Sequence, residues 1–280
     1  MQEKLKSFYA FCKNFLWQAK EDNITGLSAQ LAYYFLLSIF PFLIFTITLI
    51  GYTPLKTDDV LGLVKQYAPG VNLQIITQTI QGVLERRNTG LLSFGIIATI
   101  WSASNALNAM MHALNRAYKV QEKRSFLKAR SVAVGLTFIM IFVIVVALLL
   151  PVFGRWIGML VFRLLEISPT FLVIWEILRW LVSFCVIILV FMIIYYFAPN
   201  KRLKIKEVMV GAIFTTVCWQ AVSYAFSYYV SNFGNFSATY GSLGGIIVLM
   251  VWFYLTALIT VLGGELNAAL HESREKKLEQ

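Results

Sequence analysis

Long apolar segments recur along the whole chain, and they constrain its fold more than any other feature. A helix needs about 20 apolar residues to cross the hydrocarbon core of a bilayer. Hydrophobic residues make up 59% of the 280 positions and charged residues only 14%, against about a quarter charged in a soluble domain. The sequence therefore predicts an all-α integral membrane protein with about six transmembrane helices. The predicted spans lie near residues 28–52, 90–112, 130–153, 174–198, 207–230 and 243–268.

The positions of the basic residues predict the orientation of the chain. Cytoplasmic loops of membrane proteins are enriched in Lys and Arg. If the amino terminus lies inside, 17 of the 24 Lys and Arg residues fall in cytoplasmic segments. Both termini are therefore expected in the cytoplasm. The same topology accounts for the formal charge of +10, so nucleic acid is not expected as a partner.

The predicted organisation is one polytopic membrane domain, residues 28–270, between two short tails. In residues 1–27, basic residues stand between aromatic ones, which predicts an amphipathic helix on the cytoplasmic leaflet. Residues 271–280 form a charged cytoplasmic tail. Segment 55–88 is too polar to span and predicts amphipathic helices on the outer face. Segment 154–169 either lies at the interface or extends the flanking helices, and both interpretations stay open.

The residues that metal or nucleophilic chemistry requires are not gathered in a recognisable motif. The cysteines Cys12, Cys185 and Cys218 lie far apart, and the histidines are His112 and His271. This spacing predicts neither a disulfide framework nor a metal site. Nucleophile, base and nucleotide-binding motifs of known enzyme classes are not visible either. The sequence therefore predicts a protein that is not an enzyme and that needs no metal or cofactor.

Three blocks carry a resemblance to a known family. They read AYYFLLSIFPFLI at 32–44, WSASNALNAMMHALNRAYKV at 101–120 and YGSLGGIIVLMVWFYLTALITVLGGELNAAL at 240–270. These blocks closely resemble the YihY/BrkB family of bacterial inner-membrane proteins, and the similarity runs over almost the whole chain. The resemblance implies six helices in the bacterial cell membrane and no settled biochemical activity. Members have also carried the label ribonuclease BN, which nothing in this sequence supports.

Polar residues inside predicted spans are the first candidates for function, because an ionisable group in a membrane is costly and usually functional. Glu265 follows Gly263 and Gly264 near the cytoplasmic end of the last span. It is either a coupling carboxylate for protons or substrate, or an interfacial carboxylate paired with a basic loop residue. Four residues of the second span share one helical face and either line a substrate path or bond neighbouring helices. They are Asn105, Asn108, His112 and Asn115.

Further candidates come from a short repeat and from an uncharged connection. LNAMMH at 107–112 resembles LNAALH at 266–271, which adds Asn267 to the candidate path. The Gly-rich connection 231–245 is either a gate or ligand-facing turn, or a tight extracellular loop followed by a packing face. Its candidate residues are Tyr240, Gly241 and Ser242. Candidate contacts to lipid headgroups on the cytoplasmic side are Arg116, Lys119 and Arg124.

Together these features predict a transporter or flippase-like protein for an amphipathic or anionic envelope substrate. Any energy source would be a gradient or a partner, because nucleotide-binding motifs are not visible. The alternative is a non-catalytic membrane scaffold for cell-envelope assembly, acting through its amphipathic faces. Membrane lipids are the expected partners, and further copies of the chain or envelope proteins are candidates.

Overall fold

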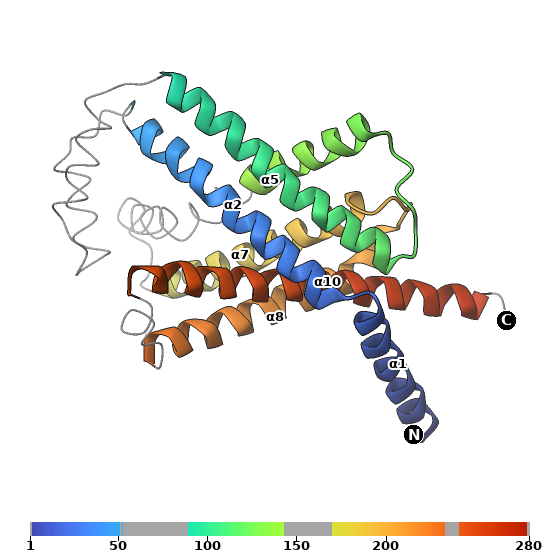
Figure 1. Ribbon diagram of the computed structural model, residues 1–280. Helices are drawn as coiled ribbons and strands as arrows, with labels where there is room; N and C mark the ends of the chain where they lie inside the picture. Colours follow the sequence, from blue (N-terminus) through green and yellow to red (C-terminus); the bar gives the residue numbers. More distant parts are fainter. Residues whose placement is uncertain (1, 51, 53–88, 143–169, 233–240, 279–280) are drawn as a thin grey trace. The chain divides into compact units, whose positions relative to one another are not determined.

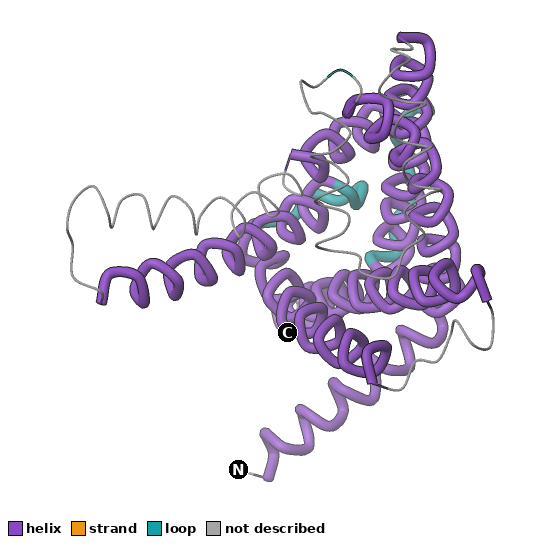
Figure 2. The backbone as a smooth tube through the Cα atoms, turned by 90° about the vertical axis from the view of Figure 1, so that its left-hand side faces the viewer, coloured by secondary structure: helices purple, strands orange, loops and turns teal. Residues whose placement is uncertain are grey.

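The computed structural model describes residues 2–50, 52, 89–142, 170–232 and 241–278, and this part of the chain is helical with short connections (Figures 1 and 2). Residues 126–142 are helical in addition to the labelled elements. Two compact units are present, one of Met1–Tyr33 with Ser104–Gln280 and one of Tyr34–Ala103. The labelled elements are α1 (Gln2–Glu21), α2 (Ile24–Ile50), α5 (Thr89–Ala117), α7 (Thr170–Phe197), α8 (Ile205–Asn232), η1 (Gly241–Leu243) and α10 (Gly244–Leu278).

Five of the described helices are long and apolar enough to cross a membrane. They contain the segments Ile24–Thr46, Thr89–Ala117, Ile174–Phe197, Ile205–Asn232 and Gly244–Glu275. Large apolar side chains on these helices are exposed, among them Ile97, Trp180 and Tyr224. Such surfaces suit a lipid environment. The predicted class of a multi-pass α-helical membrane protein is therefore confirmed.

Five of the predicted spans coincide with these helices, and the remaining one is only partly described. The predicted span 130–153 is helical over 130–142, and its remainder lies outside the described residues. The predicted amphipathic segments 55–88 and 154–169 also lie outside them. Residues 1–27 contain α1, which ends at Glu21, and Asn23 follows with a positive φ of 53° before α2 continues the chain.

In the larger unit, α8 packs against both α7 and α10. Helices α8 and α10 approach closely at two glycines, because a Cβ on Gly211 would meet the carbonyl oxygen of Gly263. A Cβ on Gly263 would in turn meet Thr215 Oγ1. Small residues let helix backbones come close together in membranes, where packing replaces the hydrophobic effect as the driving force.

Two buried polar side chains join these three helices. Tyr195 of α7 shares a 2.7 Å hydrogen bond with Thr215 Oγ1 and donates another of 2.7 Å to the carbonyl oxygen of Thr260. Asn267 of α10 accepts a 2.7 Å hydrogen bond from the Gly211 backbone N–H and donates one of 3.1 Å to the carbonyl oxygen of Val208. Both side chains are fully buried, so these bonds satisfy groups that would otherwise be unpaired.

In the smaller unit, the second half of α2 contacts the first half of α5. A Cβ on Gly95 would lie 2.9 Å from the backbone nitrogen of Phe45, so the two helices touch at this glycine. The hydroxyl groups of Tyr52 and Thr89 share a hydrogen bond of 2.8 Å at the end of the pair. Helix α2 continues through Pro41.

Candidate functional site

Two connections of the larger unit, residues 118–125 and 198–204, are held together by side-chain hydrogen bonds, and we refer to them as the loop junction. Asn115 Oδ1 accepts from the Asn200 backbone N–H at 2.6 Å, and Asn115 Nδ2 donates to Glu122 Oε2 at 2.9 Å. Asn200 Nδ2 donates to the carbonyl oxygen of Gln121 at 3.0 Å. Asn115 is buried and therefore fixes the position of both connections.

Arg124 completes the loop junction by binding the end of α7. Its guanidinium donates to the carbonyl oxygens of Phe197, Ala198 and Pro199 at 3.2, 3.1 and 2.9 Å. The last carbonyls of a helix have no partner within the helix, and a cationic side chain satisfies them well. Arg124 thus has a structural role in addition to any contact with a headgroup.

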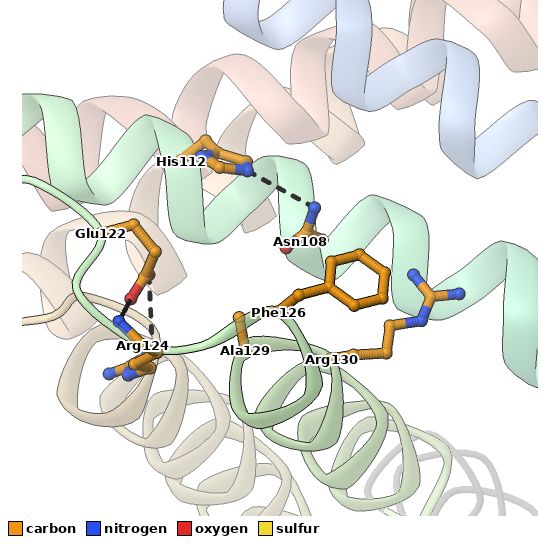
Figure 3. A pocket seen from close by; sticks show the side chains of 7 residues that line it. All are labelled: Asn108, His112, Glu122, Arg124, Phe126, Ala129 and Arg130. Carbon is orange, nitrogen blue, oxygen red and sulfur yellow. Dashed lines mark hydrogen bonds and ion pairs between the residues drawn. The ribbon is translucent and has the colours of Figure 1, made fainter.

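A pocket of about 300 Å³ lies beside the loop junction (Figure 3). Helix α5 contributes two lining residues, the connection after it two more, and the helix over 126–142 the last three. In Figure 3, Asn108 and His112 lie along one side of α5, and their Nδ2 and Nε2 atoms are 3.5 Å apart. The lining residues are Asn108, His112, Glu122, Arg124, Phe126, Ala129 and Arg130.

The charges of the pocket favour an anion. Arg124 and Arg130 bring two guanidinium groups, and Glu122 brings one carboxylate, 3.9 Å from Arg124. Arg130 donates a 2.7 Å hydrogen bond to Asn105 Oδ1, which fixes its direction. Guanidinium groups bind carboxylates and phosphates with strong charge-assisted hydrogen bonds. Phe126 also lines the pocket and is 80% exposed, so the charged groups stand beside an exposed apolar side chain.

A second polar cluster surrounds Glu265 of α10, whose side chain is buried with 2% exposure. Its carboxyl group interacts with Asp22 between α1 and α2 and with Arg116 and Lys119 at the end of α5. Neither of these two cations forms its ion pair with Glu265. Arg116 Nε is 3.2 Å from Asp22 Oδ1, and Lys119 Nζ is 3.2 Å from an oxygen of Glu272.

Tyr118 and His271 extend this cluster toward the end of α10. Their rings meet edge to face with centroids 6.1 Å apart. His271 Nδ1 lies 3.4 Å from Glu207, and Nε2 lies 3.0 Å from Glu275. Burial raises the pKa of the Tyr118 phenol, and the carboxylates of Glu207 and Glu265 raise it further. Tyr118 therefore stays neutral and can donate a hydrogen bond.

The structure brings several of the predicted site residues together at the pocket. Asn108, His112 and Arg124 line it, and Asn105 contacts it through Arg130. Sequence reasoning did not single out Arg130. Arg130 could have been identified from its position, because it is a basic residue at the start of the predicted span 130–153 and a charged residue there needs a polar partner.

Other predicted residues lie elsewhere. Asn115 belongs to the loop junction, and Asn267 lies between α8 and α10 with its amide bonded to backbone groups. The two Asn–His pairs of the short repeat thus have different surroundings. Asn267 is fully buried, whereas the equivalent Asn108 lines the pocket beside the exposed His112. Arg116 and Lys119 stand near Glu265.

The candidate turn before α10 is only partly described. Tyr240 lies outside the described residues, and Gly241 begins η1 with a positive φ of 57°. Ser242 is the middle residue of η1. Across the described ranges, no group of three His, Cys, Asp or Glu residues is placed to hold a metal ion.

The fold and these polar clusters define a multi-pass α-helical membrane protein with ionisable groups inside its larger unit. Residues 15–280 match the sequence profile of a family described as Virulence factor BrkB. The chain belongs to this family, which confirms the resemblance seen in the sequence.

Curated relatives cover most of the chain. The Bacillus subtilis protein YfkH, whose name describes it as ribonuclease-like, is 54% identical over 248 residues, which cover 89% of this chain and 90% of the relative. A UPF0761 membrane protein of Alteromonas mediterranea is 27% identical over 273 residues, covering 94% and 88%. Another, of Tolumonas auensis, is 24% identical over 275 residues, covering 95% and 86%. No solved structure matches.

Proposed function

We propose that this protein is a transporter or flippase-like protein that moves an anionic amphipathic lipid of the cell envelope across the bacterial inner membrane. The pocket beside the loop junction is the observation that carries the proposal. It combines two guanidinium groups with the amide of Asn108 and the imidazole of His112. These groups suit the phosphate or carboxylate of an anionic headgroup.

The surroundings of the pocket support an amphipathic substrate rather than a free anion. Phe126 and Leu127, 80% and 76% exposed, are separated from the basic residues Lys123 and Arg124 by Ser125 alone. Basic and apolar residues side by side are typical of a segment at the level of lipid headgroups. A lipid whose headgroup occupies the pocket can therefore keep its acyl chains beside Phe126 and Leu127.

A substitution of Arg130 tests anion binding with less effect on the fold than a substitution of Arg124 would have. Arg124 donates to three backbone carbonyl oxygens, whereas Arg130 donates to the side chain of Asn105. A guanidinium has five N–H donors, so Arg130 can hold Asn105 and an anion together.

We expect Arg130→Gln to slow movement of an anionic phospholipid about ten- to hundredfold, because a hydrogen bond to a charged group contributes roughly 1.5–3 kcal/mol. Glutamine still offers an amide to Asn105. The measurement is transbilayer movement of fluorescent phosphatidylglycerol in proteoliposomes. Lys128→Gln is the matched control, because Lys128 is exposed and does not line the pocket. Equal rates for wild type, Arg130→Gln and empty vesicles would refute the proposal.

The scaffold alternative has its own observation, the exposed face of α1. Tyr9, Leu16 and Trp17 are exposed with Lys13 and Lys20 at positions that share one helical face. Such a face suits a membrane surface or a partner helix. If the protein is a scaffold, Leu16→Ser with Trp17→Ser should abolish crosslinking to an envelope partner at native expression, whereas Arg130→Gln should leave it intact. The reverse pattern would exclude the scaffold.

A further inference from the structure

The buried carboxyl group of Glu265 is not used by the proposed headgroup pocket. It lies on α10 inside an apolar span, with 2% exposure. Among the residues that the structure describes, its Oε1 atom has no hydrogen-bond partner. An ionised carboxylate in such a place is costly unless a cation pairs with it directly. The surroundings of Glu265 therefore decide what it can do.

Asp22 is the acidic residue that acts most strongly on the carboxyl group of Glu265. Two carboxylates that act on one another repel when both are ionised, and a proton on one of them removes this repulsion. Asp22 lies between α1 and α2, and Glu265 lies on α10. A proton bound at these two residues therefore acts on elements that are far apart in the sequence.

The neighbouring cations do not replace this proton. Arg116 binds Asp22 through Nε and the carbonyl oxygen of Glu21 at 3.0 Å through its other end. Lys119 pairs with Glu272, which also accepts a hydrogen bond from Gln18 at 3.1 Å. Both cations act on Glu265 from a distance.

Titratable groups lead from the cluster toward the exposed end of α10. Glu275 has an exposed side chain, and its carboxylate lies 3.0 Å from His271 Nε2. The ring of His271 meets that of Tyr118, whose hydroxyl is buried and has no hydrogen-bond partner within the described ranges. Tyr118 interacts with the carboxylates of both Glu207 and Glu265, and Lys201 Nζ lies 5.9 Å from its ring centroid. These groups can relay a proton inward.

We propose that Glu265 and Asp22 form a binding site for one proton, loaded from the side of His271 and Glu275. Release of the proton leaves two adjacent carboxylates, which repel one another and attract Arg116 and Lys119 more strongly. Because these cations hold the end of α1 and the last turns of α10, proton release changes the contacts among α1, α5 and α10. Coupling of this change to lipid movement rests on the proposed function, whereas proton binding itself does not.

The test is infrared difference spectroscopy of the full-length protein in nanodiscs, titrated from acidic to alkaline pH without substrate. We expect a carbonyl band of a protonated carboxyl group that disappears as the pH rises. Glu265→Gln should remove this band, and Asp22→Asn should change its pH dependence. Glu176→Gln removes an exposed carboxylate of α7 that pairs with Arg179, so it is the matched control and should retain the band.

The two proposals can fail separately. A band that Glu265→Gln removes supports the proton site even if the lipid assay detects no movement, because the spectrum needs no substrate. Wild-type and Glu265→Gln spectra that agree at every pH overturn the site, even if lipid movement is found. Circular dichroism of the same samples shows that each variant has kept its helices.

Discussion

Valine in place of Gly263 is expected to prevent α8 from packing on α10 and to abolish recovery of folded protein. A Cβ at this position would lie against Thr215 Oγ1 and 2.5 Å from the hydroxyl oxygen of Tyr195. Those two groups form the hydrogen bonds that join α7, α8 and α10. Overpacking a core costs about 1–3 kcal/mol and occasionally more. Here it also separates buried polar partners, so we expect a loss at or above the upper end of that range.

The measurement is size-exclusion chromatography and thermal unfolding of the protein in detergent. Gly245→Ala provides the control on the same helix, because a Cβ there has no atom within 4 Å. That variant should behave like wild type. A Gly263→Val protein that elutes as a single species and unfolds at the wild-type temperature would show that the close approach of α8 and α10 is not required.

The sequence predicts the spans well because a bilayer sets their length and apolar character. Helices α7, α8 and α10 follow directly from their uncharged runs. The sequence does not predict which of these helices pack together, because glycines permit a close approach to any neighbouring helix. Gly263 and Gly264 are recognisable as small residues, but only the structure pairs Gly263 with Gly211.

The candidate site is predicted only in part, for a related reason. Helical periodicity places Asn108, His112 and Asn115 on one face of α5 but does not say what that face meets. In the structure, Asn108 and His112 line the pocket, whereas Asn115 binds the loop junction. Glu265 stands out in the sequence as an ionisable residue in a span. Its partner Asp22 does not, because it lies near the other end of the chain.

Arg124 shows how a residue that suits a headgroup can also stabilise the fold. Its side chain is largely buried and donates to the carbonyl oxygens of residues 197, 198 and 199. Alanine would leave the end of α7 without these donors. Hydrogen bonds to charged groups contribute roughly 1.5–3 kcal/mol each but do not add fully, so we expect Arg124→Ala to lower the free energy of unfolding by about 3 kcal/mol.

Arg124→Lys should recover only part of this loss, because one ammonium group cannot reach three carbonyl oxygens as a planar guanidinium does. Lys123→Ala is the control, since Lys123 is exposed and adjacent in sequence. Denaturant titration of the three variants in detergent measures the difference. If Arg124→Ala unfolds like Lys123→Ala, the loop junction does not depend on Arg124. The guanidinium would then be available for headgroup binding alone, and Arg124→Ala should impair lipid movement as strongly as Arg130→Gln does.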